Sequence, residues 1–397
     1  MMKKKILFIM PSMFIGGAER SLLGLLEHMD YNKVDVSVFL YRHEGEFLPF
    51  IPPQVELLPP MEAYATFDVP IKPLLLSKKM VFGAARLLSK LMLRLHCLTS
   101  GEERGVWMSM QYTARFLQPL LPRIPGQYDL AVMFLGVADT LINKVDAKVK
   151  LTWCHTAYDT LFPSRKMDLE TYGKVDGIVG VSEDCARKIR SFYPELAGKV
   201  LTVENVLAAE LIRRQSGESV GDMPQDGSIR LLSIGRYCEA KNFDNVPDIC
   251  RRIRETGLDV KWYLIGFGGD EALIRERIAQ AGMEDHVILL GKRDNPYPYI
   301  AGCDLYVQPS RYEGKCVTVW EAQILEKSVV ITRYATSASQ LKDGFDGIIV
   351  PMDNAGCAEG IAELLRDPDR MKMLSENCRR GDYSNAAQVE KLMELML

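Results

Sequence analysis

The sequence predicts an α/β protein with two Rossmann-like domains, each built on a doubly wound parallel sheet. Short β-branched runs alternate with helical stretches along the chain, and this alternation is interrupted once by a polar interval before it restarts. Nearly half of the 397 residues are apolar, which is enough to build a sizeable core. Alternating strands and helices form parallel sheets with helices on both faces. We expect the two domains to face each other across a ligand-binding cleft.

The strands are expected where apolar runs are short and bounded by polar residues. The first domain, residues 1–205, supplies Ile6–Met10, Val34–Phe39, Tyr128–Phe134, Val149–Cys154 and Val175–Val181. The polar interval includes residues 217–226. The second domain, residues 206–380, supplies Ile229–Ile234, Val260–Ile265, Val287–Leu290, Asp304–Gln308, Ser328–Thr332 and Gly347–Val350. The two domains are expected to join near residues 205–228.

Composition excludes several classes of function. A formal charge of −3 gives no reason to expect a nucleic-acid partner. The nine cysteines include no Cys-X-X-Cys pair, and the five histidines are scattered, so neither a metal site nor a disulfide framework is expected. The basic, apolar opening is reminiscent of a secretory signal, but Pro11 interrupts it and no Ala-X-Ala pattern follows. We therefore expect a buried first strand, a reducing cytoplasm and no membrane-spanning segment.

Two carboxylates, Glu313 and Glu321, bracket a stretch that directly follows an expected strand and contains Gly314. A strand that runs into a glycine turn and then a helix can direct carboxylates and free backbone N–H groups at one ligand. Carboxylates bind hydroxyl groups, and helix amides bind phosphate. A ligand that offers both is a phosphorylated sugar.

Two cations follow the first strand of the second domain. Arg236 and Lys241 lie beyond its carboxyl end, on the loop that leads to the next helix. Cations in this position can neutralise a diphosphate without a metal, although loop cations are usually only solvated charges. Gly16 and Gly17 occupy the corresponding turn of the first domain, where they either admit a ligand to the backbone or close a tight turn. Residues 266–270 lack the Gly-X-Gly-X-X-Gly pattern, so a nicotinamide cofactor is not favoured.

Together these motifs resemble the retaining glycosyltransferases of family 4, strongly over about residues 229–366 and more loosely over 1–205. The resemblance implies the GT-B fold, a terminal helix at 381–397 that returns to the first domain, and sugar transfer without a divalent metal or other cofactor. It implies a hexosyltransferase that uses a nucleotide-sugar, with a UDP-sugar favoured. The acceptor would be a glycan or a lipid-linked molecule in capsular, exopolysaccharide or other cell-surface polysaccharide synthesis.

The resemblance also implies a role for each matching residue. Arg236 and Lys241 would hold the donor diphosphate, Glu321 the ribose, and Glu313 the transferred sugar. Gly17 would approach the phosphates from the first domain, and His155 would face the donor sugar. Asn205 matches an asparagine at the interdomain crossing. The resemblance places the remaining donor-binding positions at Gly16, Gly314, Lys315, Cys316, Val317 and Thr318. Cys316 and Trp320 depart from the family pattern, in which smaller residues are usual.

Two other functions fit the same fold. A nucleotide-sugar epimerase would need residues that deprotonate or eliminate at a sugar carbon, and no such set is visible in the sequence. A non-catalytic GT-B partner subunit would not need Arg236, Lys241, Glu313 and Glu321 together, although a subunit that only binds the donor could keep them.

Residues 71–97 carry six basic residues and no acidic one. At helical spacing, five apolar side chains of this segment share one side: Leu87, Leu88, Leu91, Met92 and Leu95. Such a helix either packs on the first domain with a solvated basic edge or lies on an anionic membrane surface. The second alternative would make the protein peripheral on the inner face of the cell membrane. Acceptor specificity is expected between about residues 40 and 125.

Overall fold

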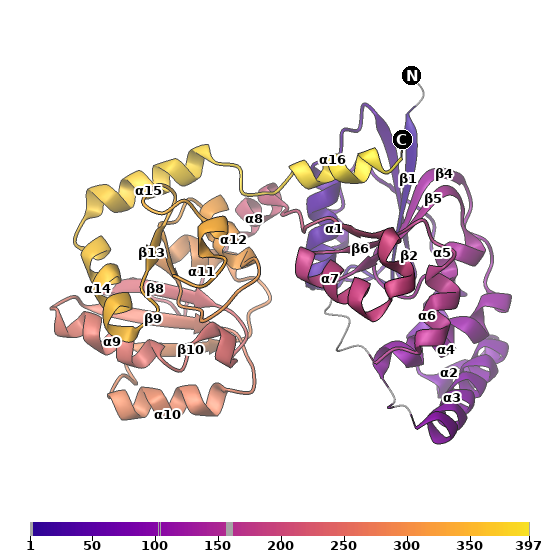
Figure 1. Ribbon diagram of the computed structural model, residues 1–397, viewed down its shortest axis with the longest axis horizontal. Coiled ribbons are helices and arrows are strands. Elements are labelled where there is room, and N and C mark those ends of the chain that lie inside the picture. Colours follow the sequence, from indigo (N-terminus) through magenta and orange to yellow (C-terminus); the bar gives the residue numbers. More distant parts are fainter. Residues whose placement is uncertain (1–2, 102, 104, 156–161, 397) are drawn as a thin grey trace. The chain divides into compact units, whose positions relative to one another are not determined.

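The computed structural model describes residues 3–101, 103, 105–155 and 162–396. The chain forms two compact units (Figure 1). The first unit comprises Met1–Ala208 together with Asn385–Leu397, and the second comprises Ala209–Ser384. The division therefore falls within a few residues of the boundaries at 205 and 380 that the sequence suggests.

The first unit is built on a parallel sheet of seven strands in the order β3-β2-β1-β4-β5-β6-β7. Their bounds are β1 (Lys4–Met10), β2 (Val34–Leu40), β3 (Glu56–Leu57), β4 (Gln127–Met133), β5 (Asp146–Cys154), β6 (Gly177–Gly180) and β7 (Val200–Thr202). Ile6 to Met10 of β1 have no exposed surface, as expected for the centre of a sheet that is covered on both faces.

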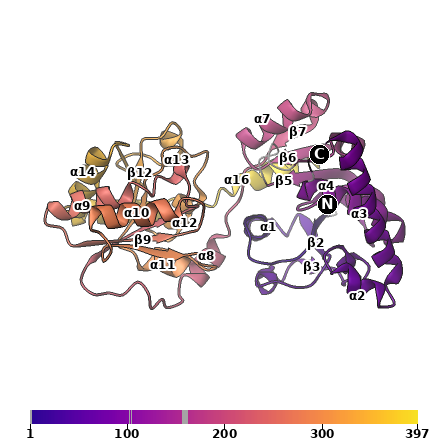
Figure 2. The same ribbon diagram turned by 90° about the horizontal axis from the view of Figure 1, so that it is seen from below.

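Helices cover both faces of this sheet (Figure 2). They are α1 (Gly17–Glu27), α2 (Ile71–Leu75), α3 (Met80–Ser100), α4 (Val106–Leu117), α5 (Asp139–Lys144), α6 (Arg165–Tyr172), α7 (Glu183–Phe192) and α16 (Ala387–Glu394). Short 3-10 turns add η1 (Leu48–Phe50), η2 (Tyr64–Phe67), η3 (Gln118–Leu120) and η5 (Pro194–Lys199).

The end of the chain packs on the first unit through α16. Val389 and Leu392 are buried, and the side-chain oxygen of Gln388 accepts a hydrogen bond from the backbone N–H of Glu204, 3.1 Å away. The side chain of Asn385 donates to the backbone oxygen of Asn205, 3.2 Å away. The terminal segment thus secures the point at which the chain leaves the first unit.

The second unit has a parallel sheet of six strands in the order β10-β9-β8-β11-β12-β13. Its strands are β8 (Ile229–Ile234), β9 (Val260–Ile265), β10 (Val287–Gly291), β11 (Leu305–Gln308), β12 (Val329–Thr332) and β13 (Ile348–Val350). Its helices are α8 (Ala209–Gln215), η6 (Glu239–Lys241), α9 (Val246–Glu255), α10 (Glu271–Ala281), α11 (Tyr297–Gly302), α12 (Val317–Ile324), α13 (Ser337–Gln340), α14 (Asn354–Leu365) and α15 (Pro368–Arg380). This strand order is that of a dinucleotide-binding Rossmann sheet.

The predicted fold class is confirmed, because both sheets are parallel and Rossmann-like. All eleven expected strands are present within a few residues of their predicted bounds. Two further strands, β3 and β7, were not predicted; they have only two and three residues and lie at the edges of the first sheet. Edge strands of this length have too few alternating residues to leave a pattern.

The segment 71–97 forms two helices, α2 and α3, rather than one. The five apolar side chains that the spacing placed on one side do share a face, and that face of α3 is exposed. The helix still packs on the first unit through its other side, where Ser89 and Leu93 are buried, so the exposed face by itself excludes neither alternative. Among the described residues, no helix combines the length and the apolar content that crossing a bilayer requires.

Candidate functional site

The best-developed polar site of the second unit lies at the carboxyl ends of β8 and β11. These neighbouring strands mark the point where the strand order of the sheet reverses, and open α/β sheets bind ligands at that point. Lys241 ends η6, which follows β8, and Glu313 lies in the loop between β11 and α12. The topology therefore brings together two residues that are 72 positions apart in the sequence.

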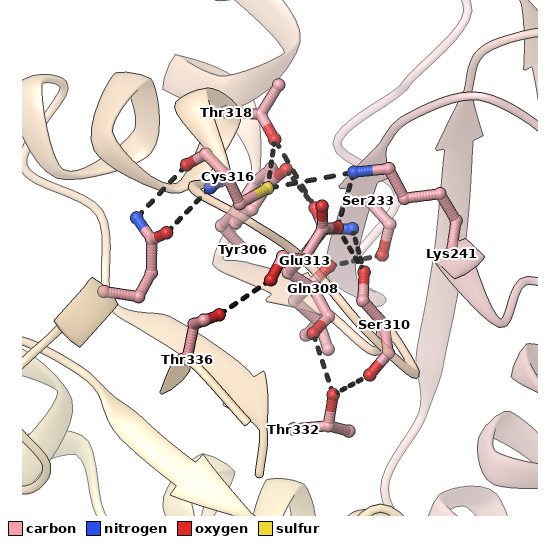
Figure 3. Close-up of polar contacts among 12 residues, drawn as sticks. Ser233, Lys241, Tyr306, Gln308, Ser310, Glu313, Cys316, Thr318, Thr332 and Thr336 are labelled. Carbon is pink, nitrogen blue, oxygen red and sulfur yellow. Dashed lines mark hydrogen bonds and ion pairs between the residues drawn. The ribbon is translucent and has the colours of Figure 1, made fainter. Parts of the chain in front are cut away.

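Lys241 and Glu313 form an ion pair at the centre of this site (Figure 3). Lys241 Nζ lies 2.5 Å from Glu313 Oε1, and the two side chains are only 18% and 11% exposed. The hydroxyl of Ser310 donates to the same carboxylate oxygen at 2.6 Å. The pair is thus largely shielded from water, where a charge-assisted hydrogen bond is stronger than at the surface.

Two local features place the Lys241 side chain. Gly235 lies beneath its aliphatic stem, because a Cβ at that position would come within 2.9 Å of Lys241 Cε. Asn242 has a left-handed backbone with φ of 59°, and its side chain donates to the backbone oxygen of Pro309 at 2.9 Å. Asparagine tolerates this conformation better than most residues. The loop after β8 is thereby fastened to the loop after β11.

Arg311 fastens the same two loops from the other side. Its backbone N–H donates to Ala240 O at 2.8 Å, and its guanidinium binds both carboxylate oxygens of Asp244 at 2.9 and 2.7 Å. A two-point contact of this kind fixes orientation as well as distance. The cation and the carboxylate of the site are therefore held on connected loops.

Cys316 and Thr318 complete the cluster at the beginning of α12. Cys316 Sγ lies 3.9 Å from Lys241 Nζ and 3.2 Å from Thr318 Oγ1. Burial raises the pKa of the Cys316 thiol, so this side chain is a neutral packing group at pH 7. Burial opposes the charge on Lys241, but the paired Glu313 carboxylate helps to outweigh this effect, and the pKa of Lys241 is raised. Lys241 is therefore a cation throughout the physiological range.

A buried polar network beneath the ion pair was not predicted from the sequence. Gln308 accepts from Tyr306 OH at 2.9 Å and donates to Ser310 Oγ at 2.9 Å, while Thr332 Oγ1 donates to Ser310 O at 2.5 Å. Thr336 Oγ1 donates to Glu313 O at 2.8 Å. The sequence did contain one signal for this network, because the expected strand Asp304–Gln308 ends in a glutamine. A buried glutamine needs hydrogen-bond partners, and Gln308 has no exposed surface.

The backbone amides at the beginning of α12 differ in availability. The N–H of Cys316 donates to Gln340 Oε1 at 2.7 Å, and Gln340 Nε2 donates back to Cys316 O at 3.2 Å. That amide can reach a ligand only if Gln340 moves. Val317 and Thr318 lie in the first turn of the helix, where amides have no partner within the helix. These two amides remain the candidates for contact with phosphate.

The other predicted residues of the second unit lie around this cluster without joining it. Arg236 is exposed, and no hydrogen bond or ion pair joins it to any residue that the structure describes. Gly314 and Lys315 are exposed, and Lys315 Nζ lies 5.0 Å from the centroid of the Trp320 ring. Glu321 is buried on α12, where it accepts from Tyr297 OH at 3.0 Å.

Tyr334 adds an unusual group close to the cluster. Its side chain is only 2% exposed, and its buried hydroxyl has no hydrogen-bond partner among the described residues. Burial, with a smaller contribution from Cys316 and Glu313, raises its pKa, so the hydroxyl stays protonated. A buried hydroxyl without a partner costs stability, and a bound ligand or water would remove that cost.

In the first unit, Gly16 and Gly17 form the beginning of α1. Gly16 is the N-cap residue, and a Cβ there would come within 2.2 Å of Glu19 Oε2. A Cβ on Gly17 would meet nothing within 4 Å. Gly17 is exposed, so the structure itself gives no packing reason for a glycine there. The pKa of Glu19 is raised by burial.

His155 follows β5 at the carboxyl edge of the first sheet. Its Nε2 lies 2.9 Å from the backbone oxygen of Phe134, and its ring contacts the Phe134 ring at a centroid distance of 4.7 Å. Because a carbonyl can only accept, Nε2 carries the proton and Nδ1 is the acceptor of the neutral ring. Burial lowers the pKa of His155 to about 4, so the imidazole is neutral at pH 7.

A pocket of about 230 Å³ lies at the carboxyl edge of the first sheet, beyond the ends of β1 and β4. Its walls come from those strand ends and from α3 and α4, and they include Tyr41, Phe67, Leu93, Val106 and Met110. The lining is mostly apolar, with Lys90 and Arg86 at its polar side. This pocket lies within the region where we expect acceptor specificity.

No group of three or more His, Cys, Asp or Glu side chains is arranged to hold a metal ion in the described part of the chain. The polar groups at the Lys241–Glu313 site instead suit a ligand with oxygen-bound negative charge and hydroxyl groups. A cation, a carboxylate and two first-turn amides lie within one loop cluster.

Comparisons with known proteins support this interpretation. Residues 223–381 match the family described as glycosyl transferases group 1. The lipopolysaccharide core biosynthesis glycosyltransferase LpsE of Rhizobium meliloti is 25% identical over 179 residues, which are 44% of this chain and 51% of that protein. A Campylobacter jejuni N-acetylgalactosaminyltransferase, whose name specifies a diphospho-undecaprenol substrate, is 28% identical over 149 residues, 37% of this chain and 40% of that protein. These matches span about half the length of the relatives or less.

Solved structures are similar over nearly the whole chain. Anabaena HepE in complex with UDP has a TM-score of 0.59 at 16% identity, with 98% of both chains covered. A variant of S. aureus TarM in complex with UDP, fondaparinux and α-GlcNAc-glycerol has a TM-score of 0.57 at 14% identity, with 99% of both chains covered. Likenesses at this identity show the fold, which is GT-B. The chain is thus a GT-B protein in which residues 223–381, with the Lys241–Glu313 site, match the glycosyl transferases of group 1.

Proposed function

We propose that the protein is a retaining glycosyltransferase of family 4, a hexosyltransferase that moves a sugar from a nucleotide-diphosphate sugar to a glycan or lipid-linked acceptor. The observation that carries this proposal is the shielded Lys241–Glu313 pair at the switch point of a sheet that matches the group 1 family. The names of the relatives support a role in cell-surface polysaccharide synthesis. The UDP bound to both structural neighbours supports a UDP-sugar as the donor.

The chemistry requires a cation next to the leaving group. When the bond between the anomeric carbon and the diphosphate breaks, the sugar becomes oxocarbenium-like and the diphosphate gains negative charge. Lys241, the exposed Arg236 and the first-turn amides of Val317 and Thr318 would stabilise that charge. The acceptor oxygen then bonds to the anomeric carbon on the face that the phosphate leaves, and its proton passes to the departing phosphate. No divalent metal is needed in this scheme.

Each remaining residue has a defined part in the proposal. Glu313 would bind hydroxyl groups of the transferred sugar, and Glu321 would bind the ribose after exchanging its contact with Tyr297. Gly16 and Gly17 would let the backbone of the first domain approach the phosphates. His155, neutral and held through Nε2, would offer a ring nitrogen to the sugar. We further propose that the protein works in the cytoplasm, peripheral to the membrane.

The proposal is tested first by donor binding. A thermal-shift series with UDP-, GDP- and ADP-sugars should single out one nucleotide, and a donor at about 100 times its Kd would stabilise the native state by about 2.7 kcal/mol. No shift with any donor would contradict the proposal. A non-catalytic relic would also fail to hydrolyse the donor slowly, and an epimerase would release an isomer instead of free sugar and nucleotide.

Metal independence is tested on the same hydrolysis reaction. We expect the rate to be unchanged when EDTA is added after dialysis against a chelating resin. A rate that falls with EDTA and returns with Mg²⁺ or Mn²⁺ would contradict this part of the proposal.

A further inference from the structure

Helix α3 presents a broad apolar face that nothing in the described structure covers. The side chains on this face are between 40% and 82% exposed: Met80, Val81, Leu87, Leu88, Leu91, Met92, Leu95 and Leu98. They recur at spacings of three, four and seven residues, so they form one continuous stripe. The helix lies at the periphery of the first unit in both views (Figures 1 and 2). An apolar surface of this extent marks an interaction site.

The opposite side of α3 holds the helix to the first unit. Ser89 and Leu93 are each 2% exposed, and both line the pocket beyond β1 and β4. Gly83 is also buried, and a Cβ there would come within 2.9 Å of the Leu75 side chain. Arg86 donates to Thr66 O at 2.9 Å and also to Val69 O. Helix α3 is therefore attached to its own domain by the side opposite the apolar stripe, and the stripe itself is not needed for that packing.

Positive charge borders the apolar stripe. Lys90 and Arg94 lie one turn apart on α3 beside it, and Lys72 and Lys78 precede the helix; all four are exposed. Residues 71–101 contain no aspartate or glutamate. In the described structure, the only acidic side chain paired with a lysine or arginine of this segment within ion-pair distance is Glu62, which binds Lys79 at 2.9 Å. The surface therefore combines apolar side chains with unneutralised cations.

We infer that this face of α3 docks on a lipid bilayer that carries anionic headgroups. The apolar stripe would enter the boundary between headgroups and acyl chains, and the bordering lysines and arginine would bind the headgroup phosphates. A second copy of the chain fits the same face poorly, since a two-fold contact would set these cations against their own copies. The charge pattern thus selects the bilayer among the surfaces that could cover the stripe.

Docking through α3 would also place the pocket beyond β1 and β4 close to the membrane surface. The pocket lies on the packed side of the same helix, and Lys90 belongs to both the pocket wall and the basic border. This step rests on the proposed function: an acceptor attached to a membrane lipid would reach the pocket from the headgroup layer. The docking inference itself stands on the surface of α3 alone.

The test is flotation with vesicles of phosphatidylglycerol and phosphatidylcholine in equal parts, compared with vesicles of phosphatidylcholine alone. We expect the full-length protein to float with the anionic vesicles and to be released by added salt. The double variant Leu91→Glu/Leu95→Glu should reduce the bound fraction about tenfold or more, and so should Lys78→Glu/Arg94→Glu. All four positions are exposed, so unchanged far-UV circular dichroism and melting temperature are expected.

A matched control makes the same kind of change on an exposed helix of the second unit. Leu273→Glu/Arg277→Glu alters an exposed leucine and an exposed arginine of α10 and should float like the wild type. The inference is overturned if the α3 variants float as well as the wild type, or if the wild type ignores anionic vesicles. It is also overturned if light scattering shows a wild-type dimer that Leu91→Glu/Leu95→Glu converts to a monomer. Donor hydrolysis in lipid-free solution reports on the proposed function separately.

Discussion

At the scale of single residues, the decisive feature is a cation and a carboxylate that are both largely buried and directly paired. Removing one partner leaves the other charge without compensation in a place that water hardly reaches. Lys241 and Glu313 also have different proposed tasks, one on the diphosphate and one on the sugar. Their single and double replacements therefore separate structural from chemical roles.

We predict that Lys241→Met lowers donor turnover on the order of 10²–10³-fold, the usual loss when a group that stabilises developing charge is removed. It should also lower the free energy of unfolding by about 1–3 kcal/mol, because Glu313 keeps only its contact with Ser310. Adding Glu313→Gln should restore part of that stability, since glutamine can still accept from Ser310, but none of the turnover. Urea unfolding and donor hydrolysis measure the two effects. Equal turnover in wild type and Lys241→Met would exclude the role of Lys241.

Tyr334 allows a second residue-scale prediction. Because its buried hydroxyl makes no hydrogen bond to the described residues, Tyr334→Phe should leave the unfolding midpoint unchanged or higher. If the hydroxyl binds a group of the donor, the same change should raise the donor KM. A lower midpoint with an unchanged KM would show that the hydroxyl serves the fold instead.

His155 makes the pH dependence predictable. Its pKa is about 4 in the folded chain and 6.5 for an ordinary histidine, so the unfolded chain takes up the proton first as the pH falls. The free energy of unfolding should therefore be insensitive to His155 above pH 6.5 and should decline between about pH 6.5 and 4. Melting curves across this range should decline more steeply for the wild type than for His155→Gln. Parallel curves would show that His155 does not have a depressed pKa.

At the scale of elements, helix α1 contains two glycines that differ in whether the structure has room for a side chain at their positions. A Cβ on Gly24 would lie 2.0 Å from the backbone oxygen of Val206, so the helix touches the chain that leaves the first unit. A Cβ on Gly17 would meet nothing. One glycine therefore serves packing, and the other is available for a ligand.

We predict that Gly24→Ala destabilises the first unit by several kcal/mol, on the order of 2–4, because backbone must move to admit the methyl group. Gly17→Ala should leave the melting temperature unchanged or slightly higher and yet weaken donor turnover, because its methyl group would face the phosphates. Calorimetry and donor hydrolysis on both variants provide the comparison. A Gly17→Ala variant with full turnover would remove that residue from the proposed site.

The elements also show how far pattern alone extends. Strands with long apolar runs were predictable because a parallel strand that is covered on both faces must be apolar at every position. The site network was not predictable, because Gln308, Thr332 and Thr336 are ordinary polar residues until the fold buries them. The exposure of α3 was not predictable either. The residue spacing predicts an apolar face but does not tell whether another part of the chain covers that face, and in the structure it is exposed.

At the scale of the whole molecule, the first unit depends on the last residues of the chain. Leu392 of α16 is fully buried against residues far earlier in the sequence, while its neighbour Lys391 is exposed. Residues 3–208 and 385–396 thus belong to one unit although the second unit lies between them in the sequence.

We predict that Leu392→Ala lowers the stability of the first unit by about 2–5 kcal/mol, the usual range for truncating a buried leucine. Lys391→Ala on the same helix should have little effect. With two separate cores, calorimetry should place the loss in one transition and leave the transition that a bound nucleotide raises unchanged. A loss confined to the nucleotide-sensitive transition would show that α16 stabilises the other unit.

By itself, the sequence determined the two-domain parallel architecture, the position of nearly every core strand, and the residues that make up the ion pair. It could do so because a buried parallel strand appears in the sequence as a short apolar run, and the charged residues of the loops that follow can be read directly. Only the tertiary structure decided that Lys241 meets Glu313 while Arg236 and Glu321 do not join them, that Gln340 occupies the Cys316 amide, and that α3 exposes its apolar face. These outcomes depend on which strand ends become neighbours and which surfaces remain uncovered, and sequence spacing does not encode either.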